Sequence, residues 1–422
     1  MKKAFTLLGM TLALGVSLSG QAPPPSLTTL HSFTGQNGDG SLPSGLTFGN
    51  DGVLYGTTAW GGNLTACSLG CGTIFQLTPV ALGGGWTETV LYQFTGENGE
   101  SDPAGVVASK TGELFGALGS AYTNGIVYEL APPAQTGGAW SLTIPYIFTG
   151  SPDGSDPSSL VIGPDGSIYG VTFTGGVASC PDDPLYGGCG IVFQLAPPVA
   201  AGGPWTEHIL HTFLGGTDGA APLSVVMGQT GTLYGTTLYG GTEAYGTAFQ
   251  LTPPVPGGGW TYSVLYNFGC CESPNSGLVA GADGRLYGTT FAIPPHAPPG
   301  YGPYTVYELK SPAAPNSAWT KTILYSFPSS DVLGTVTDGL AGVFGGTGTL
   351  YGNTGGARPG FVFSLTPPAT PGKWTGSVLH GFTGGSDGSN PSGVIVGKSG
   401  ALYGTTAYGG TGGWGTVFEL TP

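Results

Sequence analysis

The sequence has few charged residues, and the basic ones are the scarcest. Lysine and arginine together number 9 among 422 residues, charged residues make up 8%, and the formal net charge is −14. Nucleic-acid binding depends on clustered basic side chains, so nucleic acid is excluded as a partner. The chain also lacks a zinc motif, a phosphate-binding loop, a dinucleotide fingerprint and a nucleophile elbow. Motifs therefore assign no catalytic activity, and no cofactor is evident.

Long hydrophobic runs are missing too, apart from one at the N-terminus. Lys2 and Lys3 precede an apolar stretch at 4–18 and small residues near Gly20, which predicts a signal peptide over 1–20. The stretch is too short for a comfortable membrane span. Residues 21–25 read as a Pro-rich spacer. We expect an exported protein that is secreted, periplasmic or at the cell surface, without a membrane span after cleavage.

Glycine and proline, in contrast, are abundant, with 82 and 36 residues. They recur at fixed phases between apolar runs, which indicates turns rather than disorder. The segment Leu-Tyr-Gly-Thr-Thr at 54–58 returns, intact or altered, to give seven copies at intervals of 52 to 65 residues. Such a period predicts an array of one supersecondary unit. The tyrosine position of the copies holds Tyr55, Phe115, Tyr169, Tyr234, Tyr287, Tyr351 and Tyr403.

Each unit contains four short runs rich in Val, Thr, Tyr and Phe, bounded by Gly, Pro and Asp, which predict strands. The last unit stops after its third run, at Leu420, and the missing fourth run lies at 26–33. A closed ring accounts for this split, because pairing the two ends removes two raw edges. We therefore predict an all-β, seven-bladed β-propeller of four-stranded blades, closed by the N-terminal strand, which completes the C-terminal blade.

The propeller is expected to form one domain over 26–422. The predicted blades are 42–95, 102–149, 156–214, 221–269, 275–328, 338–383 and 391–422 together with 26–34.

The repeat resembles a known family. Gly-x-Leu-Tyr-Gly-Thr-Thr-x-x-Gly-Gly, followed by Gly-Thr-Val-Phe-x-Leu-Thr-Pro, is similar to the GloVer tandem repeat of exported bacterial proteins. The cleanest copies are 54–77, 233–251 and 402–420. The resemblance implies a repeat scaffold at a secreted or surface location, and it supplies no established activity or catalytic residues.

One face of the predicted ring carries the variable loops. Strands alternate in direction, so the second and fourth connections of every blade share a face. The second connection varies in length, since the tyrosine position and the third-strand aromatic are 12 residues apart at 351–363 and 24 apart at 169–193. Binding sites tend to lie on loops held by a rigid scaffold. We therefore take this variable-loop face as the functional candidate, against the alternative that its loops vary because nothing constrains them.

All six cysteines fall on the variable-loop face. Cys67 with Cys71, and Cys180 with Cys189, are predicted to form two loop-stapling disulfides, as in other exported proteins. Metal ligation is the weaker alternative because no histidine lies beside either pair. The adjacent Cys270 and Cys271 close a strained ring, stay as thiols or bridge elsewhere, and the sequence leaves these alternatives open.

Most polar residues that are candidates for a functional site occupy repeat positions, so the repeat itself explains them. His31, His211 and His380 occupy a slot that other copies fill with tyrosine, which favours structural roles. Aspartates of the Asp-Gly pairs are explained by turn chemistry, so calcium binding is unsupported although possible. His296 lies outside the consensus as a weak ligand-binding candidate. The acidic residues left over, which are weak catalytic candidates, are Asp182, Asp183, Glu243, Glu272 and Asp331.

Three aromatic residues follow the repeated segment at an identical offset: Trp60, Tyr239 and Tyr408. They form either an aromatic rim for sugars or peptides at the ring mouth or packing between blades, and the sequence does not separate the two. The sequence thus favours a binding module for extracellular carbohydrate or protein, expected as a monomer. A secreted carbohydrate-active hydrolase or lyase that uses the leftover carboxylates is the first alternative. A structural component of the cell surface is the second.

Overall fold

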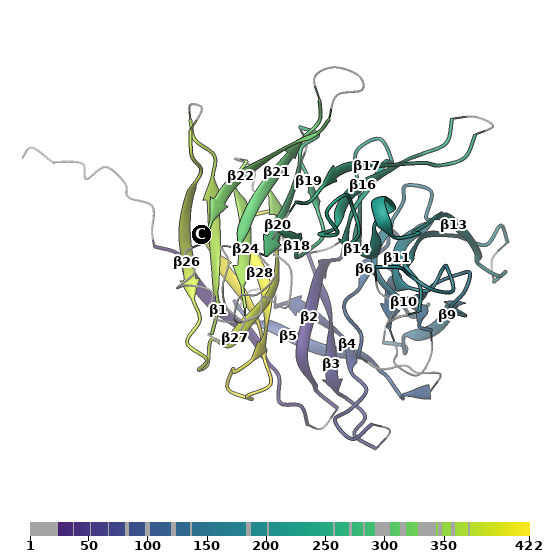
Figure 1. Cartoon of the computed structure of the whole chain (residues 1–422). Coiled ribbons are helices and arrows are strands. Elements are labelled where there is room, and N and C mark those ends of the chain that lie inside the picture. Colours follow the sequence, from purple (N-terminus) through teal and green to yellow (C-terminus); the bar gives the residue numbers. More distant parts are fainter. Residues whose placement is uncertain are drawn as a thin grey trace, which may run out of the picture.

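The computed structural model confirms the predicted propeller. Its described part forms seven antiparallel sheets, and in Figure 1 the chain passes around them from purple through teal and green to yellow. The residues described are 24–36, 38–50, 52–65, 67–80, 84–97, 102–119, 124–135, 137–182, 187–200, 202–255, 258–269, 272–281, 283–291, 304–312, 318–327, 343–344, 348–355, 359–369 and 372–422.

The first three blades contain four strands each. Blade one consists of β2 (Gly40–Phe48), β3 (Leu54–Gly61), β4 (Thr73–Pro79) and β5 (Trp86–Gln93). Blade two consists of β6 (Val107–Ala108), β7 (Leu114–Leu118), β8 (Ile126–Ala131) and β9 (Ser141–Ile147). Blade three consists of β10 (Ser155–Ile162), β11 (Ile168–Thr174), β12 (Ile191–Ala196) and β13 (Thr206–Thr212).

The next three blades follow the same plan. A 3-10 turn, η2 (Gly216–Asp218), leads into blade four, made of β14 (Ala220–Met227), β15 (Leu233–Tyr239), β16 (Thr247–Thr252) and β17 (Thr261–Asn267). Blade five has a split first strand, β18 (Ser273–Pro274) and β19 (Val279–Ala280), then β20 (Leu286–Phe291), β21 (Thr305–Lys310) and β22 (Thr320–Ser326). Blade six consists of β23 (Val343–Phe344), β24 (Leu350–Thr354), β25 (Phe361–Thr366) and β26 (Thr375–Gly381).

Blade seven joins the two ends of the chain, as predicted. It contains β27 (Ser389–Val396), β28 (Leu402–Tyr408), β29 (Thr416–Thr421) and, on its outer edge, β1 (Ser26–Ser32). Leu27 of β1 lies opposite Leu420 of β29 in an antiparallel pair. The first strands of neighbouring blades contact one another, including β2 with β27 and with β6, so the first strands surround the ring axis.

Within a blade, the repeated glycine makes room for an aromatic ring. Gly56 pairs with Phe75 of the third strand, and a Cβ at Gly56 would lie 2.5 Å from the phenyl ring. The last threonine of the segment, Thr58, shares a hydrogen bond of 2.8 Å with the hydroxyl of Thr73. Both hydroxyls are fully buried, so they satisfy each other where water is excluded.

Between blades, the repeated tyrosine packs edge-on against the tryptophan that begins the outer strand of the next blade. The ring centroids of Tyr55 and Trp140 are 6.1 Å apart, and those of Tyr403 and Trp86, which meet across the closure, are 5.9 Å apart. Edge-to-face aromatic pairs contribute about 0.5–1.5 kcal/mol beyond the area they bury. The remaining pairs are Phe115–Trp205, Tyr169–Trp260, Tyr234–Trp319 and Tyr287–Trp374.

Two predicted disulfides are present, and their cysteines are buried except for Cys67, which is half-buried. They join Cys67 to Cys71 and Cys180 to Cys189. Disulfides persist in oxidising compartments, which agrees with an exported protein. Cys270, Cys271 and the predicted signal peptide lie outside the described residues. In the part of the chain that is described, no helix is long and apolar enough to cross a membrane.

Neighbouring blades also meet at their outer strands. The outer strand of the later blade faces the turn that follows the outer strand of the earlier blade. In blade two, Asp153 accepts hydrogen bonds from the Tyr146 hydroxyl at 3.0 Å and from the backbone and hydroxyl of Thr149. Burial, together with the nearby charge of Asp153, raises the pKa of Glu207 in blade three to about 7.

Because the folded-state pKa of Glu207 lies above the ordinary glutamate value of 4.5, the folded protein holds an extra proton between these values. Stability should therefore fall as the pH rises through this window. We expect Glu207→Gln to remove that loss, so that the variant gains free energy of unfolding over the wild type at about pH 8 and much less at about pH 5. Denaturant unfolding at both pH values measures this, with exposed Glu97→Gln as control. Identical pH dependence in Glu207→Gln and the wild type would contradict it.

Phe33 tests the ring closure. It follows β1, is fully buried, and its ring centroid lies 5.1 Å from that of Phe75 in blade one. Phe33→Ala should lower the free energy of unfolding by about 3–5 kcal/mol, because it leaves a cavity between the last and first blades. Denaturant titration measures this change. Val378→Ala, at a 61% exposed position of an outer strand, should change stability by no more than about 0.5 kcal/mol.

Candidate functional site

A cavity of about 380 Å³ opens between the inner strands of blades one, two and three. Its lining includes Gly45 of β2, Val107 of β6 and Phe115 of β7, together with Ser158 and Ser159 of β10. Two carboxylates, those of Asp102 and Asp156, also line it. Asp102 lies in the fourth connection of blade one, and Asp156 lies directly after the fourth connection of blade two, so the cavity opens at the variable-loop face.

Asp102 and Asp156 have left-handed backbone conformations, with φ of 60° and 61°, although a proline follows each. Such a conformation costs a non-glycine residue about 1–2 kcal/mol. A hydrogen bond to the preceding blade accompanies it: the Asp102 amide donates to the Cys71 carbonyl at 3.3 Å, and the Asp156 amide donates to the Asn124 carbonyl at 2.9 Å. The same geometry and the same bond recur at Leu42, Ala221 and Asn390.

The side chain of Asp156 fits against a glycine of the neighbouring blade. A Cβ at Gly119 would lie 1.9 Å from Asp156 Oδ1, so a larger residue there would displace the carboxylate. Blade seven repeats this arrangement, since a Cβ at Gly355 would lie 2.2 Å from Asn390 Oδ1. The glycine after the repeated segment thus leaves room for a polar side chain at the ring mouth.

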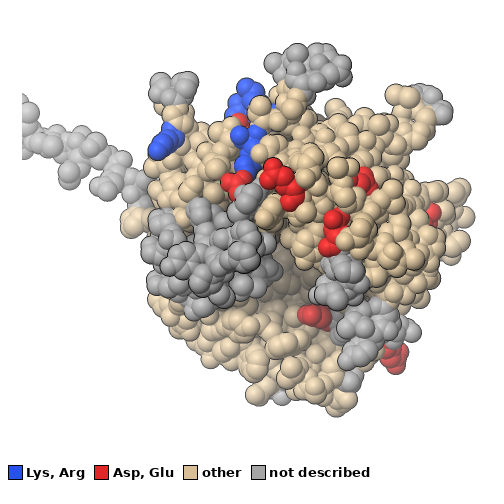
Figure 2. All heavy atoms as spheres, in the orientation of Figure 1, with Lys and Arg blue, Asp and Glu red and all other residues tan. Residues whose placement is uncertain are grey.

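Both carboxylates of the cavity are open to solvent but incompletely hydrated. The surrounding protein raises the pKa of Asp102 and of Asp156 above the usual aspartate value through partial burial. None of the described residues that line the cavity is basic. Figure 2 shows a face that is hollowed near its centre, where acidic side chains border the hollow and the basic ones gather over β21 and β22. The cavity therefore suits neutral, hydroxyl-rich or cationic ligands and disfavours anions.

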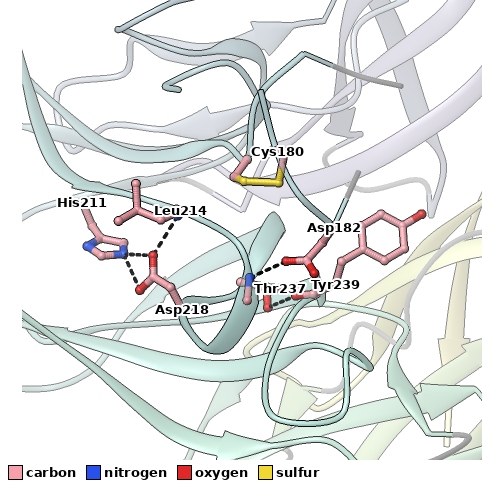
Figure 3. Close-up of a disulfide and its surroundings, with 9 residues drawn as sticks. Cys180, Asp182, His211, Leu214, Asp218, Thr237 and Tyr239 are labelled. Carbon is pink, nitrogen blue, oxygen red and sulfur yellow. Dashed lines mark hydrogen bonds and ion pairs between the residues drawn. A yellow bond between two sulfur atoms is a disulfide. The ribbon is translucent and has the colours of Figure 1, made fainter. Parts of the chain in front are cut away.

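In each disulfide, the backbone carbonyl of the second cysteine accepts a hydrogen bond from the next blade at the ring mouth. Cys71 accepts the amide of Asp102, and Cys189 accepts the amide of Ala221 at 2.9 Å. Cys71 and Cys189 are fully buried. The second disulfide is drawn in Figure 3 with the loop that leaves blade three. The crosslinks therefore fix the second connections at the points where the next blade binds to them.

Of the leftover acidic residues, the three that the structure describes, Asp182, Glu243 and Glu272, are not among those that line the cavity. Asp182 accepts a hydrogen bond from the amide of Gly216, as Figure 3 shows, and so joins two loops of one blade. Glu272 forms an ion pair with Lys321. Burial, with the nearby charges of Glu272 and Glu243, raises the pKa of Tyr266 in blade four. Asp183, Asp331 and His296 lie outside the described residues.

The three predicted rim aromatics occupy equivalent positions with different surroundings. Trp60, Tyr239 and Tyr408 pair with the inner-strand residues Ser41, Ala220 and Ser389. Tyr239 packs against a core cluster that contains the second disulfide, whereas Tyr408 is 51% exposed.

The sequence prediction missed Asp102 and Asp156, although a signal was present. Both precede proline, in Asp102-Pro103 and Asp156-Pro157, at a position that Leu42 and Ala221 fill in other copies. Acidic residues in a slot that tolerates apolar ones are exceptions to the repeat. Comparing the copies at this position identifies the two acidic residues. Only the folded ring shows that they line the same cavity.

The closed ring of seven sheets with a cavity near its axis defines the chain as a β-propeller. A profile of the Gloeobacter/Verrucomicrobia repeat matches residues 5–180 and 117–354, and the chain belongs to this family. This confirms the resemblance seen in the repeat. No curated protein matches the sequence.

Solved structures share the fold at low sequence identity. One is described as the extracellular domain of a hybrid two-component system from B. thetaiotaomicron, with 9% identity, a TM-score of 0.53, and coverage of 93% of this chain and 39% of the other. A protein from Lactobacillus plantarum has 15% identity, a TM-score of 0.52, and coverage of 79% and 84%. The PQQ-bound aldose sugar dehydrogenase of Streptomyces coelicolor has 15% identity, a TM-score of 0.44, and coverage of 94% and 99%. The first two similarities concern the fold alone.

Gly119 tests the packing that positions Asp156. Gly119→Ala should lower the free energy of unfolding by about 1–3 kcal/mol, because the new methyl group overlaps the carboxylate. In the double variant Gly119→Ala with Asp156→Ala, the penalty should be largely relieved, which denaturant unfolding of the four proteins measures as a coupling energy. Additive effects of the two substitutions would show that the two side chains do not compete for space.

Proposed function

We propose that this protein is an extracellular recognition module that binds a neutral sugar unit of a carbohydrate in the cavity between blades one, two and three. The observation that supports the proposal is that Asp102 and Asp156, both exposed to solvent, line one cavity in which no described lining residue is basic. A carboxylate accepts hydrogen bonds from two hydroxyl groups, and bonds to a charged acceptor are stronger than neutral ones.

The size of the cavity agrees with this ligand class. Its volume of about 380 Å³ falls within the range of about 300–1,000 Å³ found for small-molecule sites. Ser158 adds a hydroxyl, and the inner strands add backbone groups to the lining. The predicted signal peptide and the two disulfides support an extracytoplasmic location, where such a carbohydrate is available.

A second candidate function is acid-assisted cleavage of a carbohydrate at the same site. The observation in its favour is the raised pKa of both Asp102 and Asp156, which burial causes. Glycoside hydrolysis uses one carboxyl group as an acid and another as base or nucleophile, and the acid needs a raised pKa. Binding remains the primary proposal because both aspartates are shifted in the same direction by the same cause, whereas the reaction requires two different protonation states.

We expect Asp102→Asn and Asp156→Asn each to weaken carbohydrate binding roughly tenfold or more, since hydrogen bonds to charged groups contribute about 1.5–3 kcal/mol. A glycan array on the wild type selects the ligand, and calorimetry measures affinities. Glu113→Gln is the matched control. This glutamate accepts hydrogen bonds from the hydroxyls of Ser109 and Thr111 in the first connection of blade two, on the face opposite the cavity mouth.

The outcomes separate the two candidate functions. Retention of unchanged protein-bound glycan supports recognition, whereas release of reducing ends that stops in either aspartate variant supports hydrolysis. If the wild type binds and cleaves no glycan, or if Glu113→Gln loses affinity as strongly as Asp102→Asn, the carbohydrate proposal is wrong.

A further inference from the structure

Three metal-ligating side chains converge where the ring closes, away from the axial cavity. His31 lies on β1, Asp39 lies in the connection from β1 to β2, and Glu88 lies on β5, the outer strand of blade one. One ligand atom from each lies within 4.8 Å of the others, and all three residues are half-buried. The cluster thus joins the N-terminal strand, which completes blade seven, to the first blade.

Two atoms of this cluster lack the partners that buried polar atoms normally have. His31 Nε2 and Glu88 Oε1 are shielded from solvent and accept or donate no hydrogen bond within the described structure. His31 Nε2 is 3.6 Å from Asp39 Oδ1, which is too far for a hydrogen bond. Buried polar atoms are nearly always paired with protein, water or an ion. Because the two atoms lie together, one bound ion or water molecule in contact with all three side chains would satisfy both.

Asp39 is held in place by its own turn. Its Oδ2 accepts from the amide and hydroxyl of Thr34 at 2.7 and 2.8 Å, and its Oδ1 accepts from the amide of Gly40 at 2.8 Å. Hydrogen bonds of this kind orient a carboxylate for a metal ion.

The repeat provides two internal comparisons for this cluster. His211 with Asp218 and His380 with Asp387 occupy the same positions in blades three and six, and in each pair the imidazole reaches the carboxylate at 3.1 Å (Figure 3 shows the first). The wider separation of His31 from Asp39 is therefore not imposed by the repeat.

The three sites differ in the residue of the next blade that lies beside the histidine–aspartate pair. It is the outer-strand residue that pairs with the last leucine of the third strand, and beside His31 it is Glu88, opposite Leu77. The corresponding residue beside His211 is Tyr262, whose ring stacks on the imidazole at 3.7 Å. On the outer strand of blade seven it is Leu27. Among the three described histidine–aspartate pairs, only the one at the closure has a third ligating side chain.

We propose that His31, Asp39 and Glu88 form a binding site for a divalent transition-metal ion that fastens the closure of the ring. One imidazole nitrogen and two carboxylate oxygens match the donors that zinc takes in proteins, and water completes the coordination. In a tetrahedral zinc site with ligand distances of about 2.1 Å, neighbouring donors lie roughly 3.4 Å apart, so small side-chain rotations bring these donors to the ion. The ion would join β1 to β5 and stabilise the folded state by mass action.

The test measures zinc binding to the untagged protein by competition with a chromogenic chelator. We expect one zinc ion per chain, and about tenfold or greater loss of affinity in His31→Tyr and in Glu88→Leu. These replacements are residues that the repeat itself uses at the same positions, Tyr92 and Leu142, so the variants should fold.

The matched controls are His211→Tyr and Glu207→Leu, which make the same changes at equivalent positions elsewhere in the ring. Both should bind zinc as the wild type does. Zinc should also raise the melting temperature of the wild type and of His211→Tyr but not of His31→Tyr. The proposal is overturned by the absence of one-to-one binding, by equal losses in His31→Tyr and His211→Tyr, or by calcium that binds the site as strongly as zinc.

Discussion

Contact between neighbouring blades is the constraint on which the rest of this structure depends. The middle strands of each sheet are buried on both faces, so no blade can hide them alone. The repeated tyrosine meets the tryptophan of the next blade, and this pairing continues across the junction of the chain ends through Tyr403 and Trp86. A chain of such contacts leaves one unpaired face at each end unless it closes. Closure by β1 removes both faces and explains why the repeat is divided between the two termini.

The same contact creates the candidate site. To reach the carbonyl of the preceding blade, the residue before the proline at the start of each of these inner segments adopts a left-handed backbone, and its side chain is placed at the ring mouth. Where that residue is Asp102 or Asp156, a carboxylate lines the cavity. Strain of this kind persists only when surrounding structure determines it. Here the amide hydrogen bond to the preceding blade holds the left-handed residue in place. At two blades a disulfide also fixes the carbonyl that accepts this bond.

The two sites that we propose for this protein lie at exceptions to the repeat, and the sequence revealed only some of these exceptions. The fold, the split blade and both described disulfides followed from spacing and composition alone. The leftover acids were selected from loops, whereas the cavity takes its acids from the slot before the inner-strand proline. Loop position is a poor guide because Asp182 serves to join two loops and Glu272 pairs with Lys321. The exceptions at Asp102, Asp156 and Glu88 occupy repeat positions, where each looks like an ordinary substitution when its own blade is read alone.

The sequence by itself determined the seven-bladed ring, because a repeated pattern of turns and strands records local preferences, and the unequal ends record how they close. Only the tertiary structure decided which exceptional side chains meet. Glu88 and His31 lie in the outer strands of different blades, whereas Asp102 lies in the connection before β6 and Asp156 lies on β10. Their proximity arises from the angle and distance between packed sheets. Those quantities depend on side-chain packing across blade interfaces, which the periodicity of the chain does not encode.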